Sequence, residues 1–206
     1  MSTDQKTRWF WLVPFILFYL GWVKFMAPGV GPYYVDYALR LVMLVFIWPE
    51  RHILLEKPSR PKFWLIGLYV VVLVFYIWSD EKLYSNETAL AFDQAFFKTS
   101  TYPAIHDPVL FWFDMTIGLM MVAITEEYIY RYKLNEVLKG LHKGLAARYL
   151  ITAILFSLIH LPQGMISLGQ TFLWGLFLFY LYQKSRSLQF VIILHFLTNF
   201  VVFGLL

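Results

Sequence analysis

The sequence contains no cysteine and few charged residues. Without cysteine the chain forms no disulfide bond, no thiolate metal site and no cysteine nucleophile. Only 15% of the residues are charged, and the net charge of +4 is not arranged as a basic stripe with interleaved aromatic residues, so nucleic-acid binding is not indicated. There is also no H-E-x-x-H zinc motif, no internal repeat and no low-complexity segment.

Long apolar segments dominate what is present. Apolar residues make up 60% of the chain and aromatic residues 20%, and the mean hydropathy is +0.61. A soluble domain is about half apolar. The apolar segments lack the alternation of an outer-membrane barrel. We therefore predict an all-α fold, a polytopic transmembrane helical bundle.

Seven segments are candidates for membrane spans, since a span needs about 20 mostly apolar residues and prolines or glycines separate these segments. We interpret the first as an uncleaved anchor, because Pro28 follows Ala27 at the one small-residue site where a signal peptide would be cut. The candidates are Trp9–Met26, Tyr33–Trp48, Phe63–Trp78, Val109–Leu138, Ala146–Leu161, Leu168–Tyr182 and Leu188–Leu206.

Charge between the spans predicts an orientation. Lysine and arginine concentrate in residues 49–62, in residues 133–148 and at 184–186, whereas Asp36 and residues 80–107 supply acidic groups. The positive-inside rule then places the N-terminus inside and the C-terminus outside a cell (inner or plasma) membrane. Within the long outer connection, Ala89–Phe97 is either a short interfacial helix or an ordered loop.

Polar residues interrupt three of the apolar segments. A charged side chain at bilayer depth is costly and usually faces the bundle interior, where it serves a function. Glu127 and Arg131 are four residues apart on one helix face and can form an ion pair. Glu126 points about 100° away, so we expect it to remain free when Glu127 is neutralised. Taken alone, the Glu127–Arg131 pair is equally consistent with a structural role.

The other two segments repeat this spacing. Phe156 and His160 share one helix face, so that the aromatic ring can form the wall of a pocket around the imidazole. His195 and Asn199 share another, from which both can donate hydrogen bonds toward a common point. At about 1.5 Å per residue, the polar residues lie roughly 13–20 Å from the inner turns. We expect them to share one layer near mid-membrane.

The three motifs, E-E-x-x-x-R, F-x-x-x-H and H-x-x-x-N in this order, resemble those of the CPBP family. These are the CAAX proteases and bacteriocin-processing membrane proteins, also called Abi or Rce1-type proteases. The resemblance covers about residues 115–206. It suggests an N-terminal unit of spans with an outer loop, residues 1–108, and a catalytic helical core, residues 109–206. The chain departs from the family at Tyr132, where many members have glycine, and at Phe196, where a small residue often stands.

The resemblance implies peptide-bond hydrolysis by a glutamate-type intramembrane protease, with no cofactor and no metal. Glu126 and His160 would activate a water, and His195 and Asn199 would stabilise the oxyanion. Glu127 and Arg131 would orient Glu126, and Phe156 would support the site. The substrate would be a membrane-anchored protein or peptide, cut near its C-terminal tail or sorting signal. The expected partners are this substrate and the lipid bilayer, with no nucleic acid.

Three alternatives remain at this point. Glu126, His160 and His195 supply the ligand types of a zinc protease. Buried glutamate and histidine also serve transporters and proton relays, although these usually show repeats and broken helices. A bacteriocin-immunity or other binding protein can use the same fold without catalysis.

Overall fold

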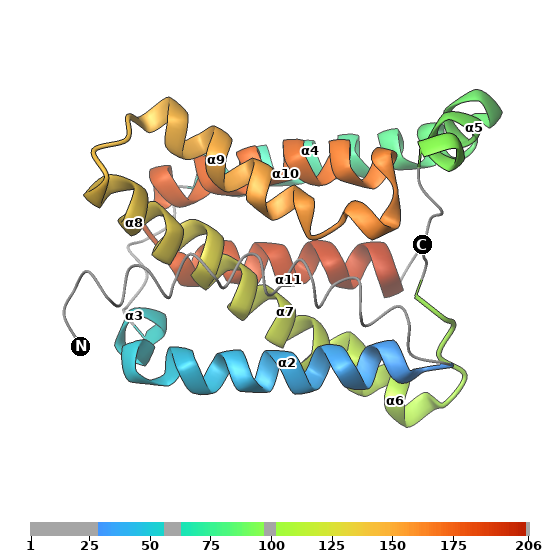
Figure 1. Ribbon diagram of the computed structural model, residues 1–206, viewed down its shortest axis with the longest axis horizontal. Helices are drawn as coiled ribbons and strands as arrows, with labels where there is room; N and C mark the ends of the chain where they lie inside the picture. The colour runs from blue at the N-terminus through green and yellow to red at the C-terminus, as the bar shows by residue number, and fades with distance from the viewer. Residues whose placement is uncertain (1–28, 56–62, 97–101, 205–206) are drawn as a thin grey trace.

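The computed structural model describes residues 29–55, 63–96 and 102–204, and this part of the chain contains helices and no strand. The all-α prediction is therefore confirmed (Figure 1). The central helix of the fold is Pro108–Gly140. The other helical segments of this part of the chain are α2 (Gly31–Ile47), η1 (Trp48–Glu50), α3 (Arg51–Leu55), α4 (Phe63–Tyr84), α5 (Glu87–Phe96), α9 (Leu145–Leu158), η4 (Leu161–Gln163), α10 (Met165–Ser185) and α11 (Leu188–Gly204).

A long helix of 33 residues, Pro108–Gly140, runs diagonally through the molecule (Figure 1). Asp107 begins it by accepting a hydrogen bond from the Leu110 backbone N–H at 2.7 Å, and Pro108 at the first position has no N–H to leave unpaired. Two wider π-helical turns interrupt its α-helical geometry, and such turns are frequent at functional sites. Its consecutive parts are α6 (Pro108–Phe113), η2 (Asp114–Gly118), α7 (Leu119–Glu127), η3 (Tyr128–Lys133) and α8 (Leu134–Gly140).

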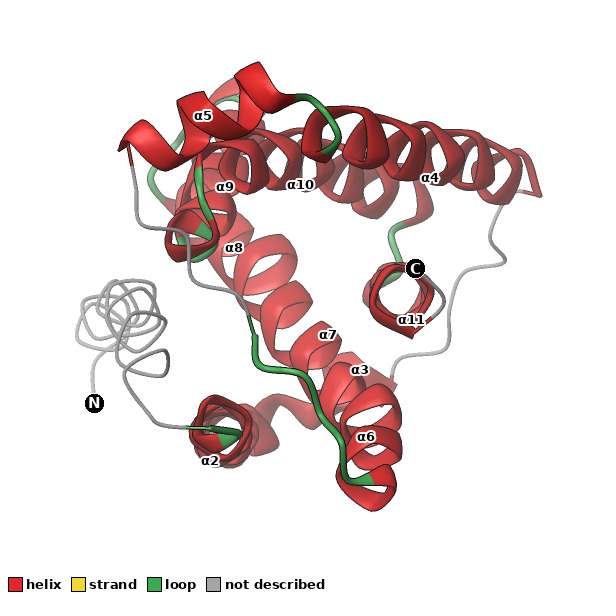
Figure 2. Cartoon of the chain, turned by 90° about the vertical axis from the view of Figure 1, so that its right-hand side faces the viewer, coloured by secondary structure: helices red, strands yellow, loops and turns green. Residues whose placement is uncertain are grey.

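The remaining helices lie on different sides of this long helix. Helices α4, α9 and α10 lie together on one side, α2 lies on the opposite side, and α11 runs beside α7 (Figure 2). A core of buried apolar side chains joins α7, η3, α9, α10 and α11, with Tyr130, Phe156, Leu178 and Val191 almost completely buried. Residues distant in sequence therefore meet around the centre of the long helix.

Helix α4 presents most of its apolar surface outward. Only Leu65 and Tyr69 are buried on it, whereas Val71, Val74 and Phe75 are more than 60% exposed. Such a surface is unfavourable in water and suited to lipid. By length and composition, α4, Pro108–Gly140 and α10 can each cross a membrane, and α9 and α11 are shorter apolar helices. The protein is a multi-pass membrane protein.

The total of seven spans stays a prediction. The first predicted span, Trp9–Met26, lies outside the described residues. The second corresponds to α2, which is 17 residues long and includes Asp36 and Arg40. Asp36 is thus a helical residue, and its assignment to an outer connection was wrong.

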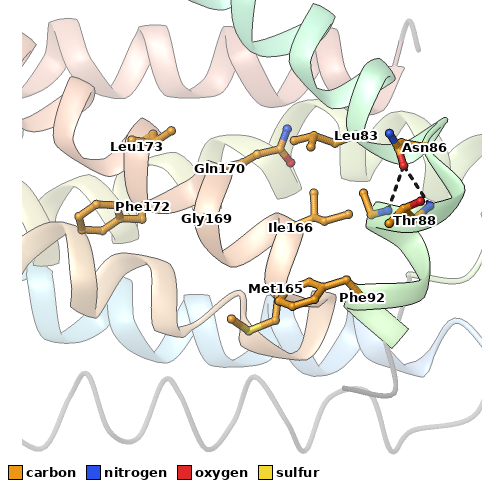
Figure 3. Close-up of a pocket in the computed structure, with 11 residues that line it drawn as sticks. Leu83, Asn86, Thr88, Phe92, Met165, Ile166, Gly169, Gln170, Phe172 and Leu173 are labelled. Carbon is orange, nitrogen blue, oxygen red and sulfur yellow. Dashed lines mark hydrogen bonds between the residues drawn. The ribbon is translucent and has the colours of Figure 1, made fainter. Parts of the chain in front are cut away.

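Of the two alternatives for the long connection, the structure has the helix: this is α5, which begins after Asn86. The Asn86 side chain accepts hydrogen bonds from the Thr88 and Ala89 backbone N–H groups, as an N-cap does (Figure 3). A largely apolar groove of about 840 Å³ opens between the end of α4, α5 and the start of α10. Residues that line it include Leu83, Phe92, Met165, Ile166, Gln170 and Leu173 (Figure 3).

Asp93 connects α5 to the start of α10. Its carboxylate is buried and accepts a hydrogen bond from the Ile166 backbone N–H at 2.9 Å, so it caps α10 from a different helix. Gly164 precedes α10 with φ of +107°, and a Cβ at this position would overlap the Asp93 carboxylate. Only glycine fits both conditions.

Candidate active site

Glu126 and Glu127 end α7 near the centre of the molecule. Both are buried, with 3% and 0% of their surface exposed, and the π-helical segment η3 follows directly. Two adjacent carboxylates in a buried position repel each other and need separate compensating groups. The structure supplies these groups from two different sides.

The Glu127 side of the site is formed by α11, η3 and α9. Glu127 Oε1 lies 2.8 Å from His195 Nδ1, and Glu127 Oε2 lies 3.2 Å from Arg131 Nε. The predicted Glu127–Arg131 pair is therefore confirmed. Glu127 also contacts the imidazole of His195 on α11, a contact that the sequence did not predict. The role of Glu127 and Arg131 in orienting Glu126 stays a prediction.

Phe156 packs against three members of the cluster. Arg131 Cζ lies 4.5 Å from the centroid of the Phe156 ring. The ring centroids of His160 and His195 lie 5.2 Å and 6.0 Å from the same centroid. The Arg131 guanidinium is completely buried and makes no hydrogen bond to the described part of the chain. Its charge is balanced by Glu127 and by the face of Phe156, a cation–π contact that is stronger when desolvated.

The Glu126 side of the site depends on α2. Arg40 Nη2 donates to Glu126 Oε1 at 2.7 Å, Nη1 donates to Thr125 Oγ1 at 2.7 Å, and Nε donates to Asp36 Oδ2 at 2.9 Å. The prediction that Glu126 stays free of an ion pair was wrong. Sequence reasoning missed Arg40, although Asp36 and Arg40, four residues apart in an apolar segment, carry the same signal as Glu127 and Arg131.

His195 lies between the two carboxylates. Its Nδ1 contacts Glu127, and its Nε2 lies 3.9 Å from Glu126 Oε2. That separation is too long for a direct hydrogen bond. A neutral imidazole that donates from Nδ1 to Glu127 would present Nε2 toward Glu126 as an acceptor.

His160 follows α9 and is not part of it. The predicted fifth span extended the helix to Leu161, but α9 ends at Leu158, and His160 lies in the turn before η4. The reason is Pro162, which has no N–H to donate to the carbonyl four residues earlier, at Leu158, and whose ring would clash with that carbonyl in a continued helix. The shared face of Phe156 and His160 is confirmed, and His160 Nδ1 lies 3.2 Å from the Phe156 carbonyl oxygen. His160 also interacts electrostatically with Glu126.

Helix α11 is fixed beside the carboxylates by α4. The Tyr69 hydroxyl donates to the Leu194 carbonyl at 3.0 Å and lies 2.9 Å from Thr198 Oγ1. This contact holds the turn of α11 on which His195 stands. Asn199, four residues after His195, is half-buried, and no hydrogen bond joins its side chain to the described residues.

The motif residues thus converge from three segments of the C-terminal half. Residues 108–201 match the family model described as Type II CAAX prenyl endopeptidase Rce1-like. These residues are similar to that family, as the three motifs indicated, and we call residues 108–201 the Rce1-like segment. No curated protein and no solved structure matches the chain. The Rce1-like segment contains every site residue that the sequence predicted, whereas Arg40, Asp36 and Tyr69 lie before it.

Among the described residues, no group of three or more histidine or acidic side chains has an arrangement that could hold a metal ion. Two of the donor groups of the zinc alternative are partly engaged elsewhere: Glu126 Oε1 pairs with Arg40, and His195 Nδ1 contacts Glu127. A guanidinium 2.7 Å from Glu126 would also repel a cation placed on that carboxylate. The donor set therefore fits a metal poorly.

Proposed function

We propose that this membrane protein is a glutamate-type intramembrane endopeptidase that hydrolyses a peptide bond in a membrane-anchored protein or peptide. The Rce1-like family is a family of endopeptidases. The observation that carries the proposal is the position of His195 Nε2, 3.9 Å from Glu126 Oε2 while Nδ1 is held by Glu127. A base and an imidazole then face one small region, and the imidazole has a fixed orientation.

In this mechanism Glu126 Oε2 accepts a proton from a water that His160 helps to orient. The resulting hydroxide attacks the substrate carbonyl, and the oxyanion is stabilised by His195 Nε2–H and by Asn199. The C–N bond then breaks as Glu126 passes its proton to the leaving amine, which regenerates the carboxylate. Oxyanion donors contribute about 10²–10³-fold each in enzymes where they have been removed.

The charge of the cluster supports this assignment. Three carboxylates, Asp36, Glu126 and Glu127, face two guanidinium groups, Arg40 and Arg131. A net negative charge inside a membrane is costly, and one proton carried by the cluster removes it. His195 lies between two of the carboxylates and is in position to carry that proton, which makes Nε2 a hydrogen-bond donor.

The substrate class follows from the membrane location and from the family. The description of the family names CAAX prenyl endopeptidases, so a prenylated C-terminal peptide is one substrate to test. A C-terminal sorting anchor is the other, if the site opens to the outer side as the predicted orientation suggests. Reporter fusions at Ser85 and Lys143 measure that orientation, with Ser85 expected outside and Lys143 inside.

Purified protein in lipid, incubated with both peptide types, tests the proposal. We expect cleavage by the wild type, a loss of roughly 10³-fold or more in Glu126→Gln and His160→Ala, and no effect of a metal chelator. Cleavage that the chelator abolishes and Zn²⁺ restores would replace this mechanism by that of a metalloprotease. Cleavage that survives Glu126→Gln would contradict the assigned base.

A further inference from the structure

Arg40 stands outside the Rce1-like segment, yet it makes the shortest contact to Glu126. Helix α2 is otherwise mainly apolar, and only 9% of the Arg40 surface is exposed. A guanidinium buried in a membrane protein is costly unless all its donors are used. Here each of its three nitrogens has an acceptor: Glu126, Thr125 and Asp36.

The acceptors are themselves held in place. Thr125 Oγ1 accepts from Arg40 and donates to the Met121 carbonyl at 2.7 Å, so the hydroxyl has one defined orientation. Asp36 lies four residues before Arg40 on the same helix and holds Nε at 2.9 Å. The guanidinium is consequently locked from two helices, and a locked guanidinium fixes the carboxylate that it binds.

This contact distinguishes the two oxygens of Glu126. Oε1 accepts from Arg40, and Oε2 is the oxygen nearest to His195 Nε2. Oε2 is therefore the oxygen available to take a proton from water in the proposed mechanism. Rotation of the carboxyl group would exchange the two oxygens, and the Arg40 contact opposes that rotation.

The groups that face Glu126 explain why it needs this cation. Glu127 and Asp36 add negative charge, and the Tyr130 hydroxyl adds no positive charge. Arg131 is already paired with Glu127, and the two histidines are needed for chemistry. Without Arg40, Glu126 would be a buried carboxylate beside two others and would take up a proton. The groups that surround it are Asp36, Arg40, Glu127, Tyr130, Arg131, His160 and His195.

We propose that Arg40 is a positioning residue for Glu126, which it keeps ionised and turned so that Oε2 faces His195. The inference rests on the proposed function in one respect, the role of Glu126 as the base. It makes helix α2 a part of the catalytic unit, although α2 lies before the segment that defines the family.

Arg40→Met tests this role, with Lys133→Met as the matched control. Lys133 also ties the N-terminal region to the long helix, through an ion pair of 2.5 Å with Glu50, but neither partner of this pair contacts Glu126. We expect Arg40→Met to lower the cleavage rate at neutral pH by about 10²-fold and to move the acidic limb of the pH–rate profile to higher pH. Arg40→Lys keeps the positive charge but not the geometry of the three contacts, so its rate should lie between those of the wild type and Arg40→Met. Lys133→Met should leave the profile in place.

A second measurement needs no substrate. Infrared absorption of protonated carboxyl groups is recorded against pH in the wild type, in Arg40→Met and in Arg40→Met combined with Glu126→Gln. We expect a protonated carboxyl at neutral pH in Arg40→Met that is absent in the wild type and in the double variant. If Arg40→Met does not fold, Arg40→Lys is expected to give a smaller change in the same direction.

The two measurements separate this inference from the proposed function. If the wild type cleaves neither peptide type but the infrared band appears as expected, the proposed protease function fails and the control of Glu126 by Arg40 stands. If cleavage occurs but Arg40→Met and Lys133→Met have the same pH profile and no new band appears, Arg40 merely joins two helices and the inference is overturned.

Discussion

Glu126 and Glu127 are neighbours in the sequence but belong to two differently constructed regions. Glu127 is bound by Arg131 and His195, and both partners lie in the Rce1-like segment. Glu126 is bound by Arg40, which lies 86 residues earlier on α2. One region is thus complete within the family segment, and the other is completed by a helix outside it.

The comparison shows that the two carboxylates have different tasks. Glu127 has both oxygens directed at protein groups, one at an imidazole and one at a fully buried guanidinium. Glu126 has one oxygen in an ion pair, and the other lies 3.9 Å from the nearest imidazole nitrogen. The first arrangement is suited to support and the second to chemistry.

Removing the charge of Glu127 is expected to have the largest effect on stability. In Glu127→Gln the Arg131 guanidinium is left buried without a counter-ion, and breaking a buried pair in this way costs about 3–5 kcal/mol. In Glu126→Gln the Arg40 guanidinium keeps Asp36 and Thr125. We therefore expect Glu127→Gln to unfold at a clearly lower temperature in detergent, while Glu126→Gln stays close to the wild type.

Activity provides the complementary measurement. Glu126→Gln should be folded and inactive, whereas Glu127→Gln should lose activity because His195 is no longer held. Equal unfolding temperatures for the two variants would show that the two regions are equivalent, and the distinction between a supporting and a reacting carboxylate would have to be abandoned.

Local spacing accounts for the part of the site that the sequence predicted. Glu127 with Arg131, and Phe156 with His160, are pairs four residues apart whose contact requires only one helical turn. The cluster itself was also foreseeable, because polar residues in apolar segments at similar depth gain by meeting. The motifs recognised there belong to the segment that the family match covers.

The remainder depends on packing between distant helices. Spacing gives the direction of Glu126 but cannot say which helix it faces, so the Arg40 contact was missed. The same limit applies to the Glu127–His195 contact, which depends on how α11 lies beside α7. The end of α9 before His160 was a different error, since Pro162 was visible in the sequence and its effect on the preceding residues was not applied.

A substitution near His160 is expected to have a medium-sized effect on stability and on the cleavage rate. Gly164→Ala forces a non-glycine residue into φ of +107° and places its Cβ against the buried Asp93 carboxylate. Such backbone strain costs about 1–3 kcal/mol. Because His160 and Gly164 flank η4 in the same connection between α9 and α10, we expect a lower unfolding temperature and a cleavage rate reduced by roughly 10-fold or more, as small misplacements of reacting groups cause.

Gly169→Ala is the control for this substitution. Gly169 lies within α10, and a Cβ there has no neighbour within 4 Å. Alanine is favoured over glycine in a helix by about 1 kcal/mol, so this variant should be as stable as the wild type or more stable. If Gly164→Ala retains full activity and stability, the turn does not constrain His160.

A partly exposed contact between the N-terminal region and the long helix lies outside the site, at Glu50. Burial by itself raises the pKa of Glu50, but hydrogen bonds from Lys133 and Tyr128 and the charge of Lys133 bring the pKa below its ordinary value. A carboxyl with a lowered pKa in the folded state stabilises the fold above its unfolded pKa, about 4.3. That contribution is lost as the pH falls through the lower folded value.

The Glu50 contribution should be small, because both partners are about one-third exposed. Pairs of this kind contribute less than about 1 kcal/mol and are screened by salt. We expect Glu50→Gln to lower the unfolding temperature slightly at pH 7, and to differ less from the wild type as the pH falls below about 4. A difference as large as that of Glu127→Gln would mean that the N-terminal region is held to the long helix mainly at Glu50, in η1. The Arg40–Glu126 pair would then be the weaker of the two contacts, and the contrast between the two carboxylates would lose its structural basis.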